Sequence, residues 1–209
     1  MLKPILTFSA ILFLAACTSV PVKQIPTEVR SYKKVNFFAA DKTVAAFKIV
    51  GRMNDFELEG VLRIQKIGPD DFTVQVLTGG AYRVLQATVA PEGIAYHYLF
   101  PEADTPLVRG RINQFLNLLV NDIGMYQRYR IKDGHTMIMY NGKDAKTRFL
   151  YQNGVPYPYA AQTVTLLNTA DLFYNHYMPV DADGYVQIPH ELVYKDGNIE
   201  LELTLISIK

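Results

Sequence analysis

Cys17 is the residue with the most distinctive chemistry, because it is the only cysteine among the 209 residues. Its thiol, a potential nucleophile, follows the apolar Leu14 and the two small residues Ala15 and Ala16. Lys3 supplies a positive charge ahead of a short apolar run, which is the layout of an export signal that is cleaved after small residues. The run is too short to span a bilayer, which takes about 20 apolar residues. The pattern predicts export and cleavage immediately before Cys17.

Residues 14–17 resemble the lipobox of Gram-negative lipoproteins. The resemblance implies that residues 1–16 are a signal peptide, that Cys17 carries diacylglycerol through a thioether, and that the new amino terminus is acylated. Several acyl chains anchor a protein stably where one is marginal. Thr18, and not Asp, follows the cysteine, which by the same resemblance implies the outer membrane, with the protein facing the periplasm. The alternative is an ordinary secretory peptide with a chance cysteine, which also exports the protein.

The rest of the sequence shows no pattern for catalysis or for a resident metal. Ser19, Ser31 and Ser207 are the serines after Cys17, and none lies in a G-x-S-x-G motif. The four histidines are at least 14 residues apart, so they form no close pair of ligands. Residues 181–184 begin like a calcium loop, but Leu192 stands where that loop needs a glutamate. We therefore expect no enzyme activity, no metal and no cofactor.

The composition is nearly neutral and favours strands. Twenty-one Lys and Arg stand against 20 Asp and Glu, and no basic run is longer than Lys33-Lys34, so nucleic acid is not an expected partner. With Cys17 acylated no disulfide can form, and packing alone must hold the fold. Fourteen tyrosines, 11 phenylalanines and short runs of β-branched residues favour a β-rich domain.

Strand-length segments separated by turn residues fill most of residues 44–209, after a lipidated tether at 17–43 with a short helical turn near Phe37. The first five segments, 45–53, 56–67, 72–77, 82–89 and 94–100, predict an antiparallel meander. The segment 105–123 has helical spacing instead and predicts an amphipathic helix able to cover the apolar face of the sheet. Further strands follow, among them 185–188 and 191–195, for a total of about eleven.

The order of these segments resembles the LolA and LolB superfamily of lipoprotein carriers, and LolB more closely because it too is a lipoprotein. The resemblance rests on 47–52, 56–64 and 71–78 as the first strands, on the helical segment 114–119 and on the closing hairpin 188–205. It implies a mainly β fold, namely an incomplete, strongly curved antiparallel β-barrel with a helical lid over an apolar cavity for acyl chains. The expected cavity residues are Leu58, Leu62, Ile64, Phe72, Val74 and Val76, and the expected lid residues are Phe115 and Leu119. The alternative is that these side chains fill a dry core.

The hairpin between the third and fourth strands departs from the family pattern. Lipid-inserting LolB proteins carry an exposed leucine at its tip, whereas this chain has residues 79–81, Gly-Gly-Ala, with Tyr82 as the nearest bulky residue. This argues against insertion of cargo by that loop. The aromatic loop 155–159 is a substitute suited to a membrane interface, or else a rigid packed turn.

The expected function is that of a membrane-anchored monomer that binds acyl chains and accepts or shuttles acylated cargo, either a lipoprotein or a lipid. A periplasmic carrier protein is a further candidate partner. One alternative is a non-catalytic accessory or scaffolding lipoprotein, with a filled core, that binds a protein partner at the membrane. Another is a hydrolase of lipid-linked substrates whose His and Asp side chains meet only in the folded chain.

Overall fold

The computed structural model describes residues 31–33, 35, 37–38, 43–53, 56–79, 81–120, 125–141, 146–165, 168–179 and 187–209. The expected signal peptide 1–16, Cys17, Gly80 and the stretch 181–184 lie outside the described residues.

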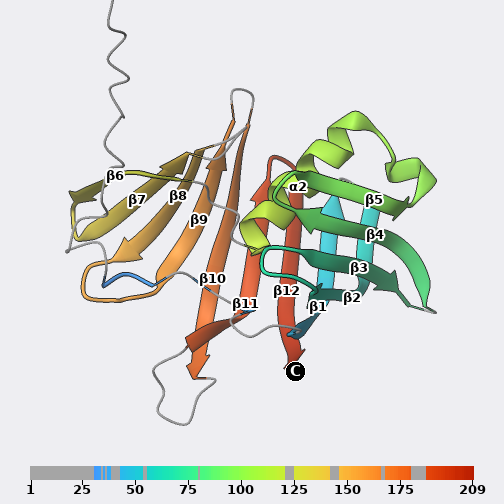
Figure 1. Ribbon diagram of the computed structural model, residues 1–209, viewed down its shortest axis with the longest axis horizontal. Coiled ribbons are helices and arrows are strands. Elements are labelled where there is room, and N and C mark those ends of the chain that lie inside the picture. Colours follow the sequence, from blue (N-terminus) through green and yellow to red (C-terminus); the bar gives the residue numbers. More distant parts are fainter. Residues whose placement is uncertain are drawn as a thin grey trace, which may run out of the picture.

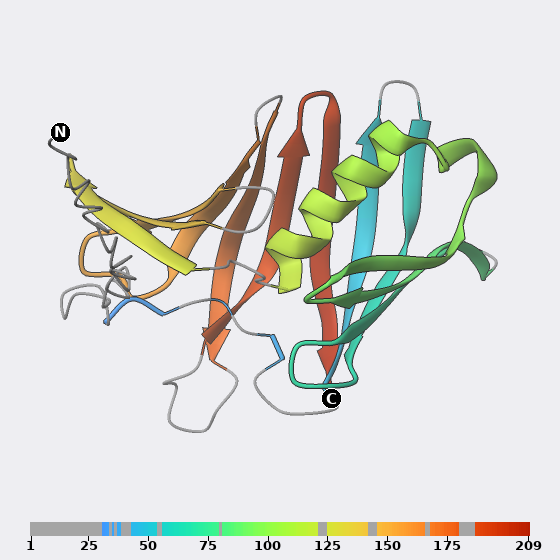
Figure 2. The same ribbon diagram turned by 45° about the horizontal axis from the view of Figure 1, so that its top comes forward.

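One open, curled sheet of twelve antiparallel strands makes up most of the described chain (Figure 1). The strands form two meanders, β1 to β5 and β6 to β12, which meet where β1 pairs with β12. The helix α2 follows β5 in the chain and crosses the concave face of the sheet (Figure 2). In the described pairing β5 and β6 are the two edges of the sheet. The fold is therefore the incomplete β-barrel with a helical lid that the sequence predicted.

The elements have the following bounds: β1 Val44–Met53, β2 Phe56–Lys66, β3 Phe72–Thr78, β4 Tyr82–Ala90, β5 Gly93–Leu99, the short 3-10 helix η1 Pro101–Ala103, α2 Pro106–Val120, β6 Met125–Lys132, β7 His135–Asn141, β8 Lys146–Gln152, β9 Pro158–Val164, β10 Thr169–Pro179, β11 Gln187–Asp196 and β12 Ile199–Ile208.

Alternation of apolar and polar residues decides which face of the sheet is covered. In β3 the side chains of Phe72, Val74 and Val76 are buried, while Thr73 and Gln75 between them are only half-buried. Because successive side chains of a strand point to opposite faces, the apolar set lines the concave side and the polar set faces water.

The strong curl of the first meander has a local cause. A Cβ atom on Gly60 would collide with the carbonyl oxygen of Leu77, so β3 passes closer to β2 here than any other residue at 60 would allow. The pairing of β3 with β4 also shifts register between Val76 and Leu77, and that of β4 with β5 shifts between Gln86 and Ala87. Such bulges bend strands and increase their twist.

The helix α2 begins where capping rules place it. The hydroxyl of Thr105 accepts a hydrogen bond from the Val108 amide at 3.3 Å, and Pro106 occupies the first helical position, where its missing N–H costs nothing. Its buried residues are Phe115, Leu116, Leu118 and Leu119. The predicted helix 105–123 is confirmed as far as Val120, and 121–124 lie outside the described residues.

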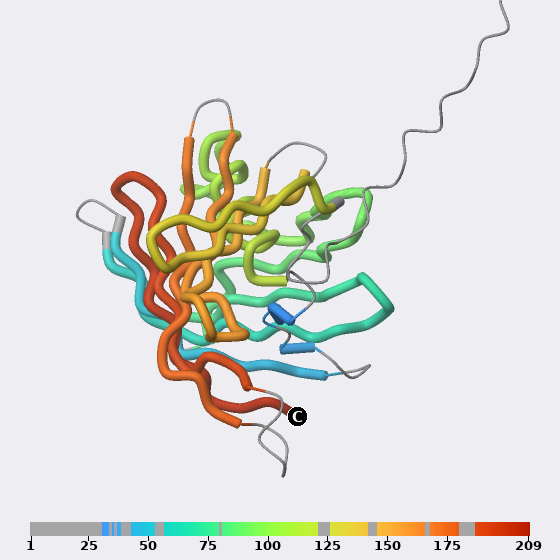
Figure 3. The backbone as a smooth tube through the Cα atoms, turned by 90° about the vertical axis from the view of Figure 1, so that its left-hand side faces the viewer, coloured from blue at the N-terminus to red at the C-terminus, as the bar shows by residue number. Residues whose placement is uncertain are grey.

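Described residues at the end of the expected tether belong to the core. Val35, Phe37 and Phe38 are at most 4% exposed. The Phe38 ring packs edge-on against Phe72 with centroids 5.1 Å apart, and Phe37 packs against Phe47 at 5.4 Å. Figure 3 shows this blue segment within the curl of the sheet. The domain therefore includes residues before 44, which the sequence did not predict.

The described chain has twelve strands where about eleven were expected, and two of those near the C-terminal end have other bounds than expected. Strand β9 begins at Pro158, inside the predicted loop 155–159, and β11 runs unbroken through positions where two strands were expected. Pro189 is tolerated in β11 because pairing with β12 starts only at Glu191, so the missing N–H costs no ladder hydrogen bond on that side.

Candidate functional site

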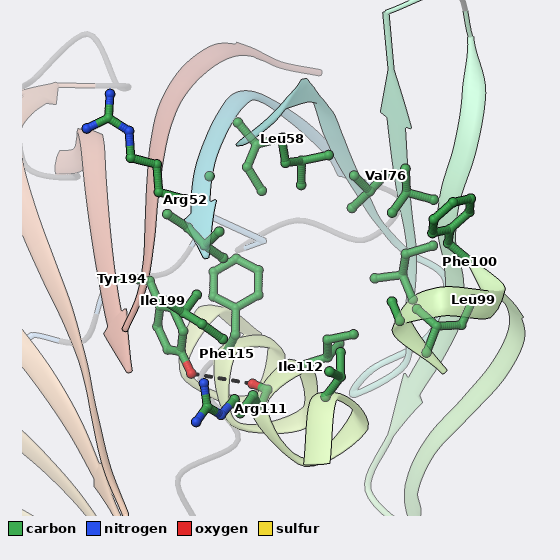
Figure 4. Close-up of a pocket in the computed structure, with 17 residues that line it drawn as sticks. Arg52, Leu58, Val76, Leu99, Phe100, Arg111, Ile112, Phe115, Tyr194 and Ile199 are labelled. Carbon is green, nitrogen blue, oxygen red and sulfur yellow. Dashed lines mark hydrogen bonds between the residues drawn. The ribbon is translucent and has the colours of Figure 1, made fainter. Parts of the chain in front are cut away.

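An apolar cavity of about 190 Å³ lies between α2 and the concave face of the sheet (Figure 4). It sits at the end of the barrel where β1 and β3 finish and β2, β4 and β12 begin. The residues that line it are Ile49, Gly51, Arg52, Leu58, Val76, Val84, Leu85, Leu99, Phe100, Ala103, Val108, Arg111, Ile112, Phe115, Tyr194, Ile199 and Leu201.

The wall of the cavity is aliphatic and aromatic, with two arginines at its margin. In Figure 4 the guanidinium groups of Arg52 and Arg111 lie on the same side of the cavity and point away from its centre. Arg52 stands opposite Glu57 in the pairing of β1 with β2 and lies 3.2 Å from its carboxylate, so its side chain points to the outer face of the sheet. Phe100, which is 40% exposed, also belongs to the lining, so the cavity reaches the surface.

Tyrosines on two strands hold α2 over the cavity. On β11, the Tyr194 hydroxyl donates to the carbonyl oxygen of Arg111 at 3.4 Å, and its ring packs edge-on against Phe115 with centroids 5.0 Å apart. On β5, the Tyr96 hydroxyl donates to Asn113 Oδ1 at 2.6 Å, and burial raises the pKa of Tyr96 to about 12. These contacts hold the first half of α2, while the buried side chains of Phe115, Leu116, Leu118 and Leu119 fix its second half in the core.

A buried carboxylate adds a polar contact beside Tyr194. The side chain of Asp196 is fully buried and accepts a hydrogen bond from Asn168 Nδ2; it also shares the single O–H of Tyr194, at 3.3 Å, with the Arg111 carbonyl. Arg111 Nε lies 3.9 Å from Asp196 Oδ2, and Arg111 Nη1 donates to Asn198 Oδ1 at 3.2 Å. Burial, with the nearby carboxylate as a second cause, raises the pKa of Tyr194. The β11–β12 turn thus holds the first half of α2.

The structure brings some of the expected site residues to the cavity and leaves others elsewhere. Leu58, Val76 and Phe115 line it. The others are buried in the packed core outside this lining: Leu62, Ile64, Phe72, Val74 and Leu119. Phe38 covers Phe72, which explains why that end of the barrel is filled. Whether any of these residues contacts lipid remains a prediction.

Several lining residues were not singled out from the sequence. They come from the β5–α2 connection and from the closing hairpin, such as Leu99, Phe100, Tyr194 and Leu201. Alternation marked parts of these strands as apolar, but no local signal shows which apolar residues face an empty space. Ile112 did belong to the helical stripe, so its place under the helix follows from its spacing.

The aromatic loop 155–159 leads into the second meander, and its two tyrosines have different surroundings. The Tyr157 ring is 7% exposed and packs against Tyr177 at 5.2 Å, and the Tyr177 hydroxyl donates to the Pro158 carbonyl at 2.6 Å. Tyr157 therefore belongs to a rigid packed turn, while Tyr159 beside it is 38% exposed. On the β3–β4 hairpin, Tyr82 is 73% exposed.

The described residues hold little other chemistry. They contain no group of three or more His, Cys, Asp or Glu placed to hold a metal ion. Within the same residues, none of the helices has the length and apolarity needed to cross a bilayer. His97 bonds to Thr88 at 2.8 Å, and His176 lies 2.9 Å from Glu191 on the surface.

Comparison with known proteins places the fold. The chain matches no protein-family model and no curated protein sequence. It is similar in structure to a LolA superfamily protein from Nitrosomonas europaea, with a TM-score of 0.60 and 12% identity over 82% of this chain and 87% of that one. For a DUF1329 family protein from Desulfovibrio piger the TM-score is 0.49, with 8% identity over 83% of this chain and 87% of that one. For a candidate outer membrane lipoprotein-sorting domain from Vibrio parahaemolyticus the TM-score is 0.46, with 8% identity over 80% of this chain and 84% of that one. The first similarity shows that the chain has a LolA-type fold.

The size of the cavity limits what it holds in this conformation. Pockets for drug-sized ligands usually measure about 300–1,000 Å³, whereas an apolar cavity of about 150 Å³ takes up a benzene ring. A cavity of about 190 Å³ therefore fits a short apolar segment. A longer chain needs α2 to move, or needs an end that extends through the opening at Phe100.

Proposed function

We propose that this protein is an outer-membrane-anchored lipoprotein that faces the periplasm and binds an acyl chain of a lipoprotein or lipid beneath α2. It accepts this cargo and passes it on without chemical change, and it needs no cofactor. The observation that carries the proposal is the apolar cavity beneath α2, in a chain with a LolA-type fold.

The free energy that such a carrier must offset is the cost of moving an acyl chain from the membrane into water. At about 0.8 kcal/mol for each buried methylene, a sixteen-carbon chain left in water costs roughly 12 kcal/mol. A carrier works when its cavity offsets most of this cost, so that the chain moves between membrane and protein with little change in free energy. The wall formed by side chains such as Leu58, Ile112 and Phe115 is suited to this.

Opening of α2 is the motion that the proposal requires. The part that moves is the first half of the helix, which the Tyr96 and Tyr194 hydroxyl contacts hold, because Leu116, Leu118 and Leu119 are buried in the core and keep the second half in place. Each hydrogen bond contributes about 0.5–1.5 kcal/mol net, which an entering acyl chain can offset by burying a few methylenes. Phe115 then acts as the lid residue in contact with cargo.

The proposed anchor is Cys17, which lies outside the described residues. Residues between Cys17 and Ser31 span at most about 50 Å when fully extended, so the domain stays close to the membrane surface. We propose that it acts as a monomer, with acylated cargo and a periplasmic carrier protein as partners, and with closer kinship to LolB-type than to LolA-type proteins.

Native mass spectrometry of the exported Cys17→Ala form, followed by lipid extraction, tests this function. We expect one acyl lipid or lipopeptide per protein. Leu58→Asp places a charge in the cavity wall and should abolish the bound lipid. Val61→Asp, on the opposite face of the same strand and 39% exposed, is the matched control and should retain it. A folded protein that carries no lipid, and takes up none when lipid is added, would contradict the proposal.

A non-catalytic accessory lipoprotein is the second candidate, and one observation favours it. Phe37 and Phe38 fill the end of the barrel where Phe72 lies, and the cavity beneath α2 measures only about 190 Å³. In that case the protein binds a protein partner at the membrane through its surface. Purification of a stoichiometric protein partner with a lipid-free barrel would favour this candidate.

A further inference from the structure

The outer face of β6, β7 and β8 concentrates positive charge. Residues 125–152 hold six Lys and Arg against two Asp and Glu, in a chain whose formal net charge is +1. No two of these cations are adjacent in the sequence, so the excess forms no basic run. Spacing by two places Arg128, Arg130 and Lys132 on one face of β6.

The strand pairing identifies this face of β6 as the outer one. Tyr129, between Arg128 and Arg130, stands opposite Ile138, which is buried in the core. Because successive side chains of a strand point to opposite faces, the two arginines beside Tyr129 point away from the core. Arg128, Arg130 and Lys132 are all exposed.

A further arginine joins this face from β8. Met139 of β7 stands opposite Arg128 on one side and opposite Arg148 on the other, so the three side chains lie in one row. Arg128 Nε lies 3.3 Å from the sulfur of the buried Met139, and Arg148 Nε has no hydrogen-bond partner among the described residues. Both guanidiniums keep N–H donors in the fork geometry that suits a phosphate group. The basic face thus consists of Arg128, Arg130, Lys132 and Arg148.

Acidic side chains leave most of this charge uncompensated. In the described part of the chain, Lys132 is the residue of the basic face that has an acidic partner, with Nζ 3.5 Å from Asp133 Oδ2. Both side chains of this pair are exposed, so water weakens it. On the outer face of the first meander, by contrast, Lys48 lies 2.8 Å from Glu59. The second meander therefore exposes an excess of one sign.

The chain that leads from Cys17 joins the domain at the same end of the sheet. The Tyr32 hydroxyl is 3.0 Å from Thr136 Oγ1 of β7, and the Tyr32 ring packs against Tyr151 with centroids 4.7 Å apart. Thr136 stands directly opposite Ile131 of β6. This end of the sheet lies far from β1 to β5 in the strand order and lines no part of the cavity (Figure 1).

Exposed apolar side chains accompany the charge. Ile131, Val155 and Tyr159 are all exposed. The Asn153 amide donates to the Gly134 carbonyl at 2.9 Å, which joins the β8–β9 turn to the β6–β7 turn and brings these side chains to one end of the strands. Basic residues beside exposed aliphatic and tyrosine side chains are typical of surfaces that lie on an anionic membrane.

We infer that the basic face and the adjoining turns dock on the surface of an anionic lipid bilayer, where the cations contact headgroup phosphates and Ile131 lies at the interface. The inference rests on the anchoring part of the proposed function. The acylated Cys17 supplies the stable attachment, and the basic face sets the orientation of the domain. The half of the sheet that holds the cavity is then left free to meet cargo.

Vesicle flotation tests this docking on the exported Cys17→Ala protein, which has no lipid anchor. One set of vesicles contains phosphatidylcholine alone, and the other also contains phosphatidylglycerol. Because each Lys or Arg near an anionic surface contributes about fivefold in affinity, we expect binding to the anionic vesicles to be at least about 25-fold stronger. Added salt should reduce this difference.

Paired variants separate the basic face from net charge. Arg130→Gln combined with Lys132→Gln should weaken binding to the anionic vesicles by about 10- to 30-fold. Lys48→Gln combined with Arg63→Gln removes the same charge from the outer face of β1 and β2 and should change binding by less than about threefold. An equal loss in the two double variants would overturn the assignment to the basic face.

Tryptophan fluorescence tests the orientation, because the chain contains no tryptophan of its own. With anionic vesicles, the emission of an Ile131→Trp variant should shift to the blue and be quenched by brominated lipids. Tyr82→Trp, at a 73% exposed position of the β3–β4 hairpin, is the control and should not be quenched. Quenching of the Tyr82→Trp variant alone would overturn the proposed orientation.

These results are independent of acyl binding in the cavity. Equal binding to both kinds of vesicle would overturn the docking inference, while lipid recovered by native mass spectrometry would still support the proposed carrier. Retention of the protein on polyglutamate without binding to anionic vesicles would overturn it too, and would assign the basic face to an acidic protein partner. Docking by a protein that takes up no lipid would support this inference and contradict the carrier function.

Discussion

Replacing Ile112 with phenylalanine fills the cavity beneath α2 from the side of the helix. Ile112 lines the cavity, and isoleucine and phenylalanine have similar helix propensities. The substitution adds three carbon atoms, which contribute at most about 2.4 kcal/mol when buried, against about 1–3 kcal/mol for any overpacking. The free energy of unfolding should therefore change by less than about 1.5 kcal/mol.

Ligand binding should change much more than stability. The three added carbon atoms extend into the cavity of about 190 Å³ and should exclude at least two methylenes of the acyl chain. At about 0.8 kcal/mol each, their loss weakens binding by more than tenfold. Urea denaturation measures the stability, and calorimetry with decanoate measures the affinity. Leu107→Phe, at a 68% exposed position of the same helix, is the control. A folded Ile112→Phe protein that binds decanoate as tightly as the wild type would refute this account of the site.

Three further predictions concern the fold. Phe38→Ala should lower the free energy of unfolding by about 3–5 kcal/mol in urea denaturation, because the ring is 4% exposed and packs against Phe72; a change below 1 kcal/mol would show that this segment is not part of the core. Gly60→Ala should cost about 1–3 kcal/mol in the same assay, because its Cβ would collide with the Leu77 carbonyl, and unchanged stability would contradict the close strand approach. The free energy of unfolding should be constant near neutral pH and fall between about pH 10 and 12. Burial raises the pKa of Tyr96 in the folded protein to about 12, whereas a tyrosine in the unfolded chain titrates near 10. The Tyr96 hydroxyl therefore loses its proton at lower pH in the unfolded chain, which favours unfolding. This contribution is fully present below pH 10 and falls by at most about 1.4 kcal/mol per pH unit, less where water screens the half-buried hydroxyl; urea denaturation at stepped pH checks the sign.

The sequence predicted the elements of this fold because their signals are local. Period-two alternation marked the apolar face of β3, and the helical spacing of Ile112, Phe115 and Leu119 marked α2. Thr105 and Pro106, residue types that favour a helix start, stand where α2 begins. These patterns depend on neighbours a few residues apart, so a single chain is enough to find them.

The boundary between cavity and core depends on contacts far apart in the sequence. Leu58 and Leu62 lie on the same face of β2, yet Leu58 lines the cavity and Leu62 is in the packed core. Their difference arises from Phe37 and Phe38, which fill one end of the barrel from a segment expected to be a tether, and from the curl at Gly60. No periodicity within β2 encodes either of these features.

Photo-crosslinking with a diazirine-labelled fatty acid, followed by mass spectrometry of the crosslinked peptides, tests the central claim most directly. The account predicts crosslinks on both walls of the cavity, to the α2 peptide that holds Ile112 and Phe115 and to the sheet at Leu58 or Leu99. Unlabelled decanoate should compete for them. Crosslinks confined to the outer face of the sheet, such as the strand around Gln75, or labelling that decanoate does not reduce, would contradict an acyl-binding site beneath the helix.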